Sequence, residues 1–472
     1  MRTQLYIDGV WLDGTGTLDV TDPSDGTVIA KVATSSDEQN AAAIDAADRA
    51  AADWAATAPR VRAEILRKAF EIMTSEADYI AELISKENGK ALPDAKGEVA
   101  YAAEFFRWFS EEAVRTPGDF RKSPSGDKRI LVTHQPIGVS LLITPWNFPA
   151  GMATRKIGPA VAAGCTMILK PAGETPLTAL HIVDIMERAG LPKGVLNVIL
   201  PAQTGPAISK VLHDPRVKNL SFTGSTAVGK ILLREAADQV IRCSMELGGN
   251  APFVVLDDAN IEEAVKGLML AKMRNGGAAC TSANRIYVAR SIGDKFIAEF
   301  AKAMATLKMG VGREAGTTLG ASVSVKERNK IAELVDAAKS RGGKVHTGAV
   351  LPEGPGAFYP ATVIEVAASD EILVNEIFGP VAPVVLFDTD AEALKLANDT
   401  DYGLISYVYS EDMKRAIRFA EGMESGMVAI NRGMISDPAA PFGGVKQSGL
   451  GREGGFDGIH EFLQTKYIGV EI

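Results

Sequence analysis

The chain has 472 residues, of which 46% are hydrophobic and 23% charged, and its formal net charge is −9. This composition is typical of a globular protein with a large core, and the length suits about three domain-sized units. The negative charge argues against nucleic acids and anionic membranes as standing partners. No apolar run of about 18 residues predicts a membrane span, and no signal-peptide pattern precedes Asp8.

The cysteines and histidines indicate a reducing compartment and no metal centre. Three cysteines, an odd number in a long chain, fit the cytoplasm better than a disulfide framework. The five histidines lie far apart, and no pair has the spacing of a zinc site. We therefore expect a cytoplasmic protein without a bound metal.

Helical patterns dominate the first part of the chain. Apolar spacing predicts helices over residues 37–57, 60–88 and 95–114, and a polar stretch at 117–128 indicates a boundary or an excursion. From Ile137 onward, short apolar runs alternate with helical segments. These predict strands at 139–143, 166–169, 195–200 and 217–222 and helices at 152–163, 176–189 and 204–212. The alternation indicates a parallel sheet covered by helices on both faces.

A second alternating series begins near Pro252. It predicts strands at 253–256, 286–289, 381–387 and 406–409 and helices at 261–274 and 293–307. We therefore expect two doubly wound α/β units in tandem. The tail at 463–470 has a strand-like pattern and could pair with another element or another subunit.

Two segments of the first unit are candidate cofactor sites. The segment 222–229, Phe-Thr-Gly-Ser-Thr-Ala-Val-Gly, follows a predicted strand and opens a helix, where free N–H groups can meet a pyrophosphate. It is not the usual Gly-x-Gly-x-x-Gly fingerprint, and a plain tight turn explains it about as well. Lys170 ends another strand, at the edge where α/β sheets bind ligands, although a solvated lysine is equally compatible.

Cys280 is the candidate nucleophile. It lies among glycines and alanines that leave space for a substrate at the sulfur, although most lone cysteines are buried and inert. A nucleophilic thiol needs a base and a donor for an oxyanion. Glu246 ends a strand before two glycines, and Asn147 offers a side-chain amide at another strand end. Taken singly, a surface glutamate and a turn asparagine explain these two residues as well.

Taken together, seven motifs in this order resemble the aldehyde dehydrogenase superfamily. They are Pro-Trp-Asn-Phe-Pro (145–149), Lys-Pro (170–171), Phe-Thr-Gly-Ser-Thr-x-x-Gly (222–229), Glu-Leu-Gly-Gly (246–249), the cysteine at 280, Glu-Ile-Phe-Gly-Pro (376–380) and Pro-Phe-Gly-Gly-x-Lys-x-Ser-Gly (441–449). The resemblance covers the whole chain. Any one of these motifs is unspecific, whereas seven in order are very specific.

The resemblance implies a role for each motif. Cys280 would be the nucleophile, Glu246 the general base, and the Asn147 side chain the oxyanion donor beside the Cys280 backbone amide. The cofactor would be bound by Trp146, Lys170, Gly173, Gly224, Ser225, Gly229, Leu247, Glu376 and Phe378. The implied reaction is oxidation of an aldehyde by NAD or NADP through a thiohemiacetal and a thioester on Cys280.

The resemblance also implies an architecture. An α/β protein of the aldehyde dehydrogenase fold would have a Rossmann-like cofactor domain (1–113 and 137–248) and an α/β catalytic domain (249–446). A β oligomerisation element would be made from 114–136 and 447–472. The implied assembly is a homodimer or a homotetramer.

Within the superfamily, the details are most similar to succinate-semialdehyde dehydrogenases. Arg155, Arg274 and Ser436 fall where that subfamily binds the substrate carboxylate, and guanidinium groups bind carboxylates bidentately. Pairing of these arginines with acids elsewhere in the protein is the alternative. We expect succinate semialdehyde as the substrate, with another acidic or aromatic aldehyde as the runner-up. The alternative from another class of enzyme is a thiol hydrolase that needs no cofactor.

Two positions depart from the common pattern. Where the family usually has a glutamate after Lys-Pro, this chain has Gly173, with Glu174 next to it. A carboxylate at that place repels the 2′-phosphate of NADP, so its absence predicts that NADP is preferred and NAD is second. Ser282 replaces a second cysteine found in many subfamily members, so no redox disulfide with Cys280 is expected.

Overall fold

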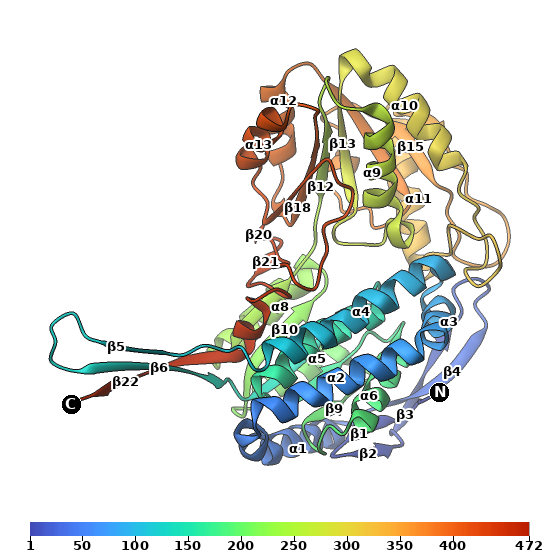
Figure 1. Cartoon of the computed structure of the whole chain (residues 1–472). Coiled ribbons are helices and arrows are strands. Elements are labelled where there is room, and N and C mark those ends of the chain that lie inside the picture. The colour runs from blue at the N-terminus through green and yellow to red at the C-terminus, as the bar shows by residue number, and fades with distance from the viewer. Residues whose placement is uncertain (472) are drawn as a thin grey trace.

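A computed structural model describes residues 1–471, which form two α/β lobes and a three-stranded arm that projects from the first lobe (Figure 1). The sheet of the first lobe has eight strands in the order β2-β1-β9-β8-β7-β10-β11-β21. Its five central strands are parallel: β7 (Val139–Ile143), β8 (Met167–Lys170), β9 (Leu196–Val198), β10 (Val217–Thr223) and β11 (Arg242–Glu246). The strand order reverses between β7 and β10, where α/β sheets bind ligands beyond the carboxyl ends of their strands.

Short antiparallel strands complete this lobe. β1 (Leu5–Ile7) and β2 (Val10–Leu12) form one edge of the sheet, and β21 (Gly449–Leu450) forms the other. A separate hairpin pairs β3 (Gly16–Thr21) with β4 (Val28–Thr34). The sequence pattern predicted none of the four N-terminal strands.

Helices cover both faces of the first sheet. They are α1 (Asp37–Ala56), α2 (Pro59–Ser75), α3 (Ala77–Asn88), α4 (Leu92–Glu112), α5 (Pro149–Ala163), α6 (Pro176–Ala189), α7 (Thr204–Leu212) and α8 (Thr226–Ala237). One core lies between the sheet and α2 to α6, and the other lies under α1, α7 and α8. Helices α2, α5 and α6 each begin with a proline, which needs no N–H partner there.

The second lobe has a seven-stranded sheet in the order β14-β15-β16-β13-β12-β18-β19. Its strands are β12 (Ala251–Val255), β13 (Ala283–Ala289), β14 (Lys344–Thr347), β15 (Thr362–Glu365), β16 (Val381–Phe387), β18 (Ile405–Tyr409) and β19 (Met427–Ile430), and only β14 is antiparallel. α9 (Ile261–Met273) and α10 (Arg290–Ala305) cover one face. α11 (Val325–Ser340), α12 (Asp390–Asn398) and α13 (Met413–Gly422) cover the other.

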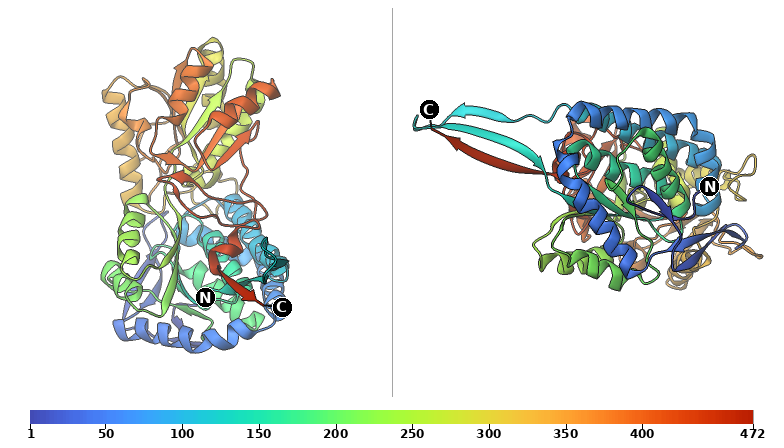
Figure 2. Two further views of the ribbon diagram at one scale, coloured as in Figure 1. Left: turned by 90° about the vertical axis from the view of Figure 1, so that its left-hand side faces the viewer. Right: turned by 90° about the horizontal axis from the view of Figure 1, so that it is seen from below.

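The arm consists of β5 (Asp119–Lys122), β6 (Arg129–Pro136) and β22 (Leu463–Val470), in the order β22-β6-β5. It extends well away from both lobes in Figure 1 and in the right-hand view of Figure 2. The remaining short elements are β17 (Tyr402–Gly403) paired with β20 (Val445–Lys446), and the 3₁₀ turns η1 (Arg274–Gly277), η2 (Glu371–Leu373) and η3 (Gly458–Phe462). Within residues 1–471, no helix is both long and apolar enough to cross a membrane.

The predicted α/β fold with two doubly wound units is confirmed. The helix predicted over 60–88 is instead two helices, because Glu76 leaves helical geometry (φ −104°, ψ 14°) and its carboxylate binds Arg188 of α6. The domain boundaries stay predictions. The chain passes from the first sheet to the second between β11 and β12, but the segment predicted from 447 onward is divided. β21 joins the first sheet, η3 packs on α5, and only β22 belongs to the arm.

Candidate active site

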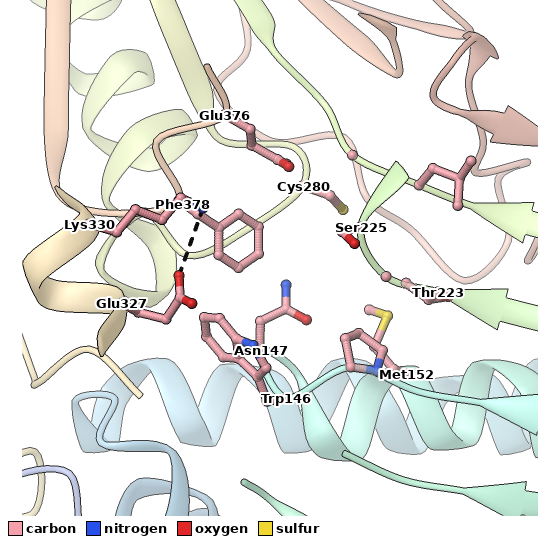
Figure 3. Close-up of a pocket in the computed structure, with 14 residues that line it drawn as sticks. Trp146, Asn147, Met152, Thr223, Ser225, Cys280, Glu327, Lys330, Glu376 and Phe378 are labelled. Carbon is pink, nitrogen blue, oxygen red and sulfur yellow. Dashed lines mark ion pairs between the residues drawn. The ribbon is translucent and has the colours of Figure 1, made fainter. Parts of the chain in front are cut away.

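A cavity lies where the carboxyl edge of the first sheet faces the amino edge of the second (Figure 3). The loop 144–148 after β7, here called the Asn147 loop, and the end of β10 form its first wall. Segments before β13 and β16 form the second wall. The lining residues are Pro145, Trp146, Asn147, Met152, Thr223, Gly224, Ser225, Leu247, Gly248, Cys280, Glu327, Lys330, Glu376 and Phe378. The cavity therefore begins at the strand-order reversal between β7 and β10.

Cys280 lies in the segment between η1 and β13, with its thiol at the cavity. Burial raises the pKa of this thiol to about 12, while Arg155 and Arg274 act to lower it. The resting sulfur is therefore a thiol, and attack on a carbonyl requires that a base take its proton. Gly249 passes directly behind it, since a Cβ at that position would lie 2.3 Å from the Cys280 carbonyl oxygen.

Asn147 directs its side-chain amide toward this part of the cavity. Its Nδ2 donates a hydrogen bond to the Ala278 carbonyl at 3.2 Å, which uses one of its two N–H groups. Figure 3 shows the amide nitrogen on the side of the pocket that holds Cys280. The second N–H is available to an oxyanion formed at the sulfur.

Glu246, the last residue of β11, is turned away from the cavity. Its side chain is buried beside Gly443, where a Cβ would lie 2.9 Å from Oε1, and neither carboxyl oxygen has a hydrogen-bond partner in the part of the chain that the structure describes. Burial, together with the charge of Glu453, raises its pKa well above the usual glutamate value, which Arg155 and Lys156 partly oppose. The structure therefore does not place this carboxyl group next to Cys280.

The nicotinamide end of a dinucleotide fits the walls of the cavity. Phe378 and Trp146 meet edge to face, with ring centroids 5.2 Å apart, and Phe378 is held at a positive φ of 56°. Glu376 is half-buried and accepts a hydrogen bond from the Gly249 amide at 3.0 Å, and the loss of solvent around its carboxyl group raises its pKa to about 7. Aromatic walls with one half-buried carboxyl group suit a flat ring attached to a ribose.

Candidate residues for the phosphate and adenosine ends lie along the same edge of the first sheet. Ser225 is the N-cap of α8 and accepts from the Val228 amide at 3.4 Å, so the helix N-terminus points at the cavity. Gly224 lines the same wall, and Gly229 packs against Leu247, where a Cβ would lie 2.4 Å from a methyl group. Farther along the edge, Lys170 ends β8 and burial lowers its pKa; Gly173 lies beside Leu18 of β3.

Comparisons with known proteins agree with this geometry. The model of the aldehyde dehydrogenase family matches residues 11–468. The chain belongs to the aldehyde dehydrogenase family. A succinate-semialdehyde dehydrogenase of Paenarthrobacter nicotinovorans is 52% identical, covering 94% of this chain and 99% of the relative. A glutarate-semialdehyde dehydrogenase of Pseudomonas putida is 46% identical, covering 100% and 98%. The crystal structure of an E. coli NADP dependent enzyme has a TM-score of 0.98 at 43% identity, covering 100% and 98%.

The predicted reaction class is therefore confirmed: the protein is an NAD(P)-dependent aldehyde dehydrogenase. Among residues 1–471, no group of three or more His, Cys, Asp or Glu side chains is placed to hold a metal ion. All three cysteines are free, and Ser282, next to the nucleophile candidate, donates from Oγ to the Lys272 carbonyl oxygen at 3.3 Å.

Arg274 and Ser436 of the dehydrogenase line a second, smaller cavity, which the two chain neighbours of Cys280 also line. Its walls are Leu270, Ala271, Arg274, Ala279, Thr281, Tyr407, Gly433, Met434, Ile435 and Ser436. The Arg274 guanidinium lies 5.0 Å above the Phe148 ring and 3.2 Å from the Met434 sulfur. No carboxylate of residues 1–471 approaches it within 4.0 Å. Its charge is therefore uncompensated by any ion pair.

Arg155 does not face a cavity beside Arg274, contrary to what its spacing in the sequence predicted. Its side chain is 1% exposed, its Nε donates to Glu453, and its guanidinium lies 4.2 Å above the Phe442 ring. The helix that carries it packs inside the lobe, so a position two turns along faces the core rather than an entrance. Its Nη2 is buried without a hydrogen-bond partner among residues 1–471, and the arginine still acts to lower the pKa of Cys280.

Sequence reasoning missed two charged residues of the site. Glu327 and Lys330 of α11 line the cavity beside Phe378 and form an ion pair at 4.0 Å (Figure 3). Ser324 caps this helix, accepting from the Glu327 amide at 3.3 Å, so a Ser-x-x-Glu signal was present. That signal predicts a helix start, but it does not show that the first turn faces the cofactor site.

Proposed function

We propose that this dehydrogenase oxidises a short aldehyde that ends in a carboxylate, with succinate semialdehyde as the best candidate. The observation that carries the proposal is the unpaired Arg274, which lies with Ser436 on the cavity adjoining Cys280. A carboxylate that leaves water needs a compensating charge, which Arg274 supplies. Two relatives act by name on succinate and glutarate semialdehyde, and both substrates carry a carboxylate far from the aldehyde.

In this proposal Cys280 is the nucleophile. Its sulfur adds to the aldehyde carbon after a base removes the thiol proton, and the carbonyl oxygen becomes an oxyanion. The free N–H of Asn147 and the backbone N–H of Cys280 donate to that oxygen. A bound nicotinamide supplies the hydride acceptor, so that the thiohemiacetal on Cys280 becomes a thioester.

Glu246 is the proposed base for water in the second half of the reaction. It takes a proton from the water that attacks the thioester, which releases the acid and the Cys280 sulfur. To do so its side chain rotates away from Gly443, a motion that costs no hydrogen bond because its oxygens have none. The same freedom lets it withdraw when a nicotinamide ring needs the space.

We infer that the cofactor is held by Trp146, Lys170, Gly173, Gly224, Ser225, Gly229, Leu247, Glu376 and Phe378, and that NADP is preferred over NAD. Gly173 offers no carboxylate to repel a 2′-phosphate, and Lys170 lies three residues before it with a cation to pair with one. The solved E. coli relative is an NADP dependent enzyme by its description, which supports the preference.

We also propose a homodimer or homotetramer in the cytoplasm. The arm formed by β5, β6 and β22 exposes Phe120, Tyr467 and Ile468 far from either lobe, as expected of a surface covered by another copy. The three free cysteines suit a reducing compartment. Static light scattering would measure the mass in solution directly.

One assay tests the substrate proposal. Aldehydes of matched length with and without a terminal carboxylate are supplied with NAD or NADP, and absorbance at 340 nm reports the reduced cofactor. We expect the highest kcat/KM for succinate semialdehyde with NADP. A preference for the uncharged aldehyde would refute the assignment of Arg274, and a preference for an aromatic aldehyde would favour the runner-up substrate class.

A further inference from the structure

A buried ion pair lies directly beneath the Asn147 loop. Lys90, between α3 and α4, donates from Nζ to Glu98 of α4 at 2.6 Å and to the Asn147 carbonyl oxygen at 2.7 Å. The two charged side chains are 1% and 0% exposed. Burying two charges is costly, and such a pair stabilises a fold little compared with apolar side chains of the same size. Its position beneath the loop therefore calls for another explanation.

The second carboxylate oxygen of Glu98 binds the other end of the loop. Its Oε1 accepts from the Ala150 amide at 2.8 Å and the Gly151 amide at 3.2 Å, the first free N–H groups of α5. Phe148, the N-cap residue of α5, has no side chain that could accept from them. Glu98 thus caps α5 from a neighbouring helix, while Lys90 binds the carbonyl three residues before Ala150.

Two asparagines connect the same loop to the cysteine segment. Asn88, which ends α3, donates from Nδ2 to the Trp146 carbonyl oxygen at 2.9 Å. Asn275 donates from Nδ2 to the Asn147 carbonyl oxygen at 2.8 Å and to the Ala278 carbonyl oxygen at 3.0 Å. The Ala278 carbonyl also accepts from the Asn147 side chain. The Asn147 carbonyl oxygen therefore accepts from both Lys90 and Asn275. Asn275 also binds the carbonyl of Ala278, which lies two positions before Cys280.

We propose that Lys90 and Glu98 are positioning residues that hold the Asn147 amide at the oxyanion formed on Cys280. This inference rests on the proposed role of Asn147. An oxyanion donor works at about 2.7–3.1 Å from the oxygen, and a misplacement of about 1 Å can cost ~10²-fold in rate. The ion pair holds the Asn147 carbonyl and the start of α5 that follows it, and neither of its side chains lines the cavity.

The test replaces the pair by Lys90→Met/Glu98→Gln, which removes both charges and keeps similar shapes. We expect kcat to fall by ~10- to 100-fold, because the amide is misplaced only in part. The KM for the aldehyde and the Kd for the cofactor should stay near the wild-type values. The rate at which iodoacetamide alkylates Cys280 should also stay unchanged, since alkylation forms no oxyanion.

A double-mutant cycle with Asn147→Ala separates positioning from general damage. If the pair acts through Asn147, then Lys90→Met/Glu98→Gln costs little further kcat in the Asn147→Ala background. Full additivity in this cycle would overturn the positioning proposal while leaving the role of Asn147 intact. Wild-type kcat in Asn147→Ala alone would instead refute the proposed oxyanion donor, and with it the basis of this inference.

The chain offers a matched control for the capping role. Glu87 is an equally buried glutamate that caps α6, accepting from the Leu177 and Thr178 amides at 2.8 and 2.9 Å. Glu87→Gln should lower the melting temperature but leave kcat and the cycle unaffected. If the pair variant does not fold, Asn88→Ala, which releases only the Trp146 carbonyl, serves in its place. A few-fold fall in kcat that is not additive with Asn147→Ala supports the proposal, and an additive one contradicts it.

Discussion

The Asn147 loop and the Glu246 side chain, both proposed to act on Cys280, are held in opposite ways. The Asn147 carbonyl oxygen of the loop accepts from Lys90 and Asn275, and the Ala150 and Gly151 amides directly after the loop donate to Glu98, all at 3.2 Å or less. The buried carboxyl group of Glu246 has no hydrogen bond among residues 1–471. A donor that stabilises charge in the transition state works best when already in place, whereas a base used in a later step must be able to move.

The largest effect is expected at Cys280, on which both regions are proposed to act. Cys280→Ala should lower dehydrogenase activity by at least ~10⁴-fold, because Cys280 is the one cysteine of residues 1–471 that lines the cavity and only a thiol forms the thiohemiacetal. Circular dichroism and cofactor titration should match the wild type. Cys243→Ala, at a half-buried cysteine of β11 outside the cavity, is the control and should remain active. Turnover by Cys280→Ala would end the mechanistic proposal.

The movable side of the comparison is tested by Glu246→Gln. We expect kcat to fall ~10²–10⁴-fold, the usual value of a general base. Since the base form is the ionised one and its pKa is raised, wild-type kcat should increase with pH through a range well above the ordinary glutamate pKa. This rising limb should be absent from the variant. Rapid-mixing absorbance would show whether a first burst of reduced cofactor survives, which places the base in hydrolysis of the thioester.

The parallel strands from Ile137 onward could be predicted because buried β-branched runs between helices have few other interpretations. The strands β1 and β2 could not be predicted, since each is a run of only three apolar residues, and runs of that length are also common in helices and loops. Helix 60–88 is divided at Glu76, whose carboxylate binds Arg188 of α6, a residue from a distant part of the sequence. Partners of that kind are set by tertiary packing, which local patterns do not contain.

The same limit applies to the site. The resemblance to the family implied that Asn147 and Cys280 share one site, and both line the same cavity. The motifs did not show that Lys90 lies beneath the loop, since a charged residue before a helix usually faces water. Nor did they show that Glu453 forms an ion pair with Arg155, because the two residues are far apart in sequence.

Arg155 and Arg274 show the same contrast, because Arg155 is held by an ion pair and Arg274, among residues 1–471, is not. Arg274→Ala should raise the KM for succinate semialdehyde by ~10- to 100-fold, from loss of a charge-assisted hydrogen bond of about 1.5–3 kcal/mol. An uncharged aldehyde of similar length should be affected much less. Arg155→Ala should impair both substrates and lower the melting temperature, because Glu453 is then a buried carboxylate with one partner fewer. Equal losses on both aldehydes in Arg274→Ala would assign that arginine to the fold.

The smallest effect is expected at the adenosine end of the cofactor site. Here Lys170 at the end of β8 offers a cation, whereas Gly173 offers no side chain. A Cβ at Gly173 would lie 3.0 Å from the end of the Leu18 side chain, a flexible neighbour that can move aside. Gly173→Glu should therefore fold, and its carboxylate should repel a 2′-phosphate. We expect the ratio of kcat/KM values for NADP over NAD to fall on the order of tenfold, which corresponds to about 1.4 kcal/mol.

Glu174 is the neighbour that decides how this last result is interpreted. Its side chain is exposed next to Gly173, and it acts to raise the pKa of Lys170, so part of the repelling charge is already near the phosphate position. Glu174→Gln should thus raise the preference for NADP, by less than Gly173→Glu lowers it, because the carboxylate lies one residue farther along the loop. Both ratios come from the same absorbance assay with each cofactor in turn. A wild type that rejects NADP, or an unchanged ratio in Gly173→Glu, would show that cofactor choice is made elsewhere along the edge of the first sheet.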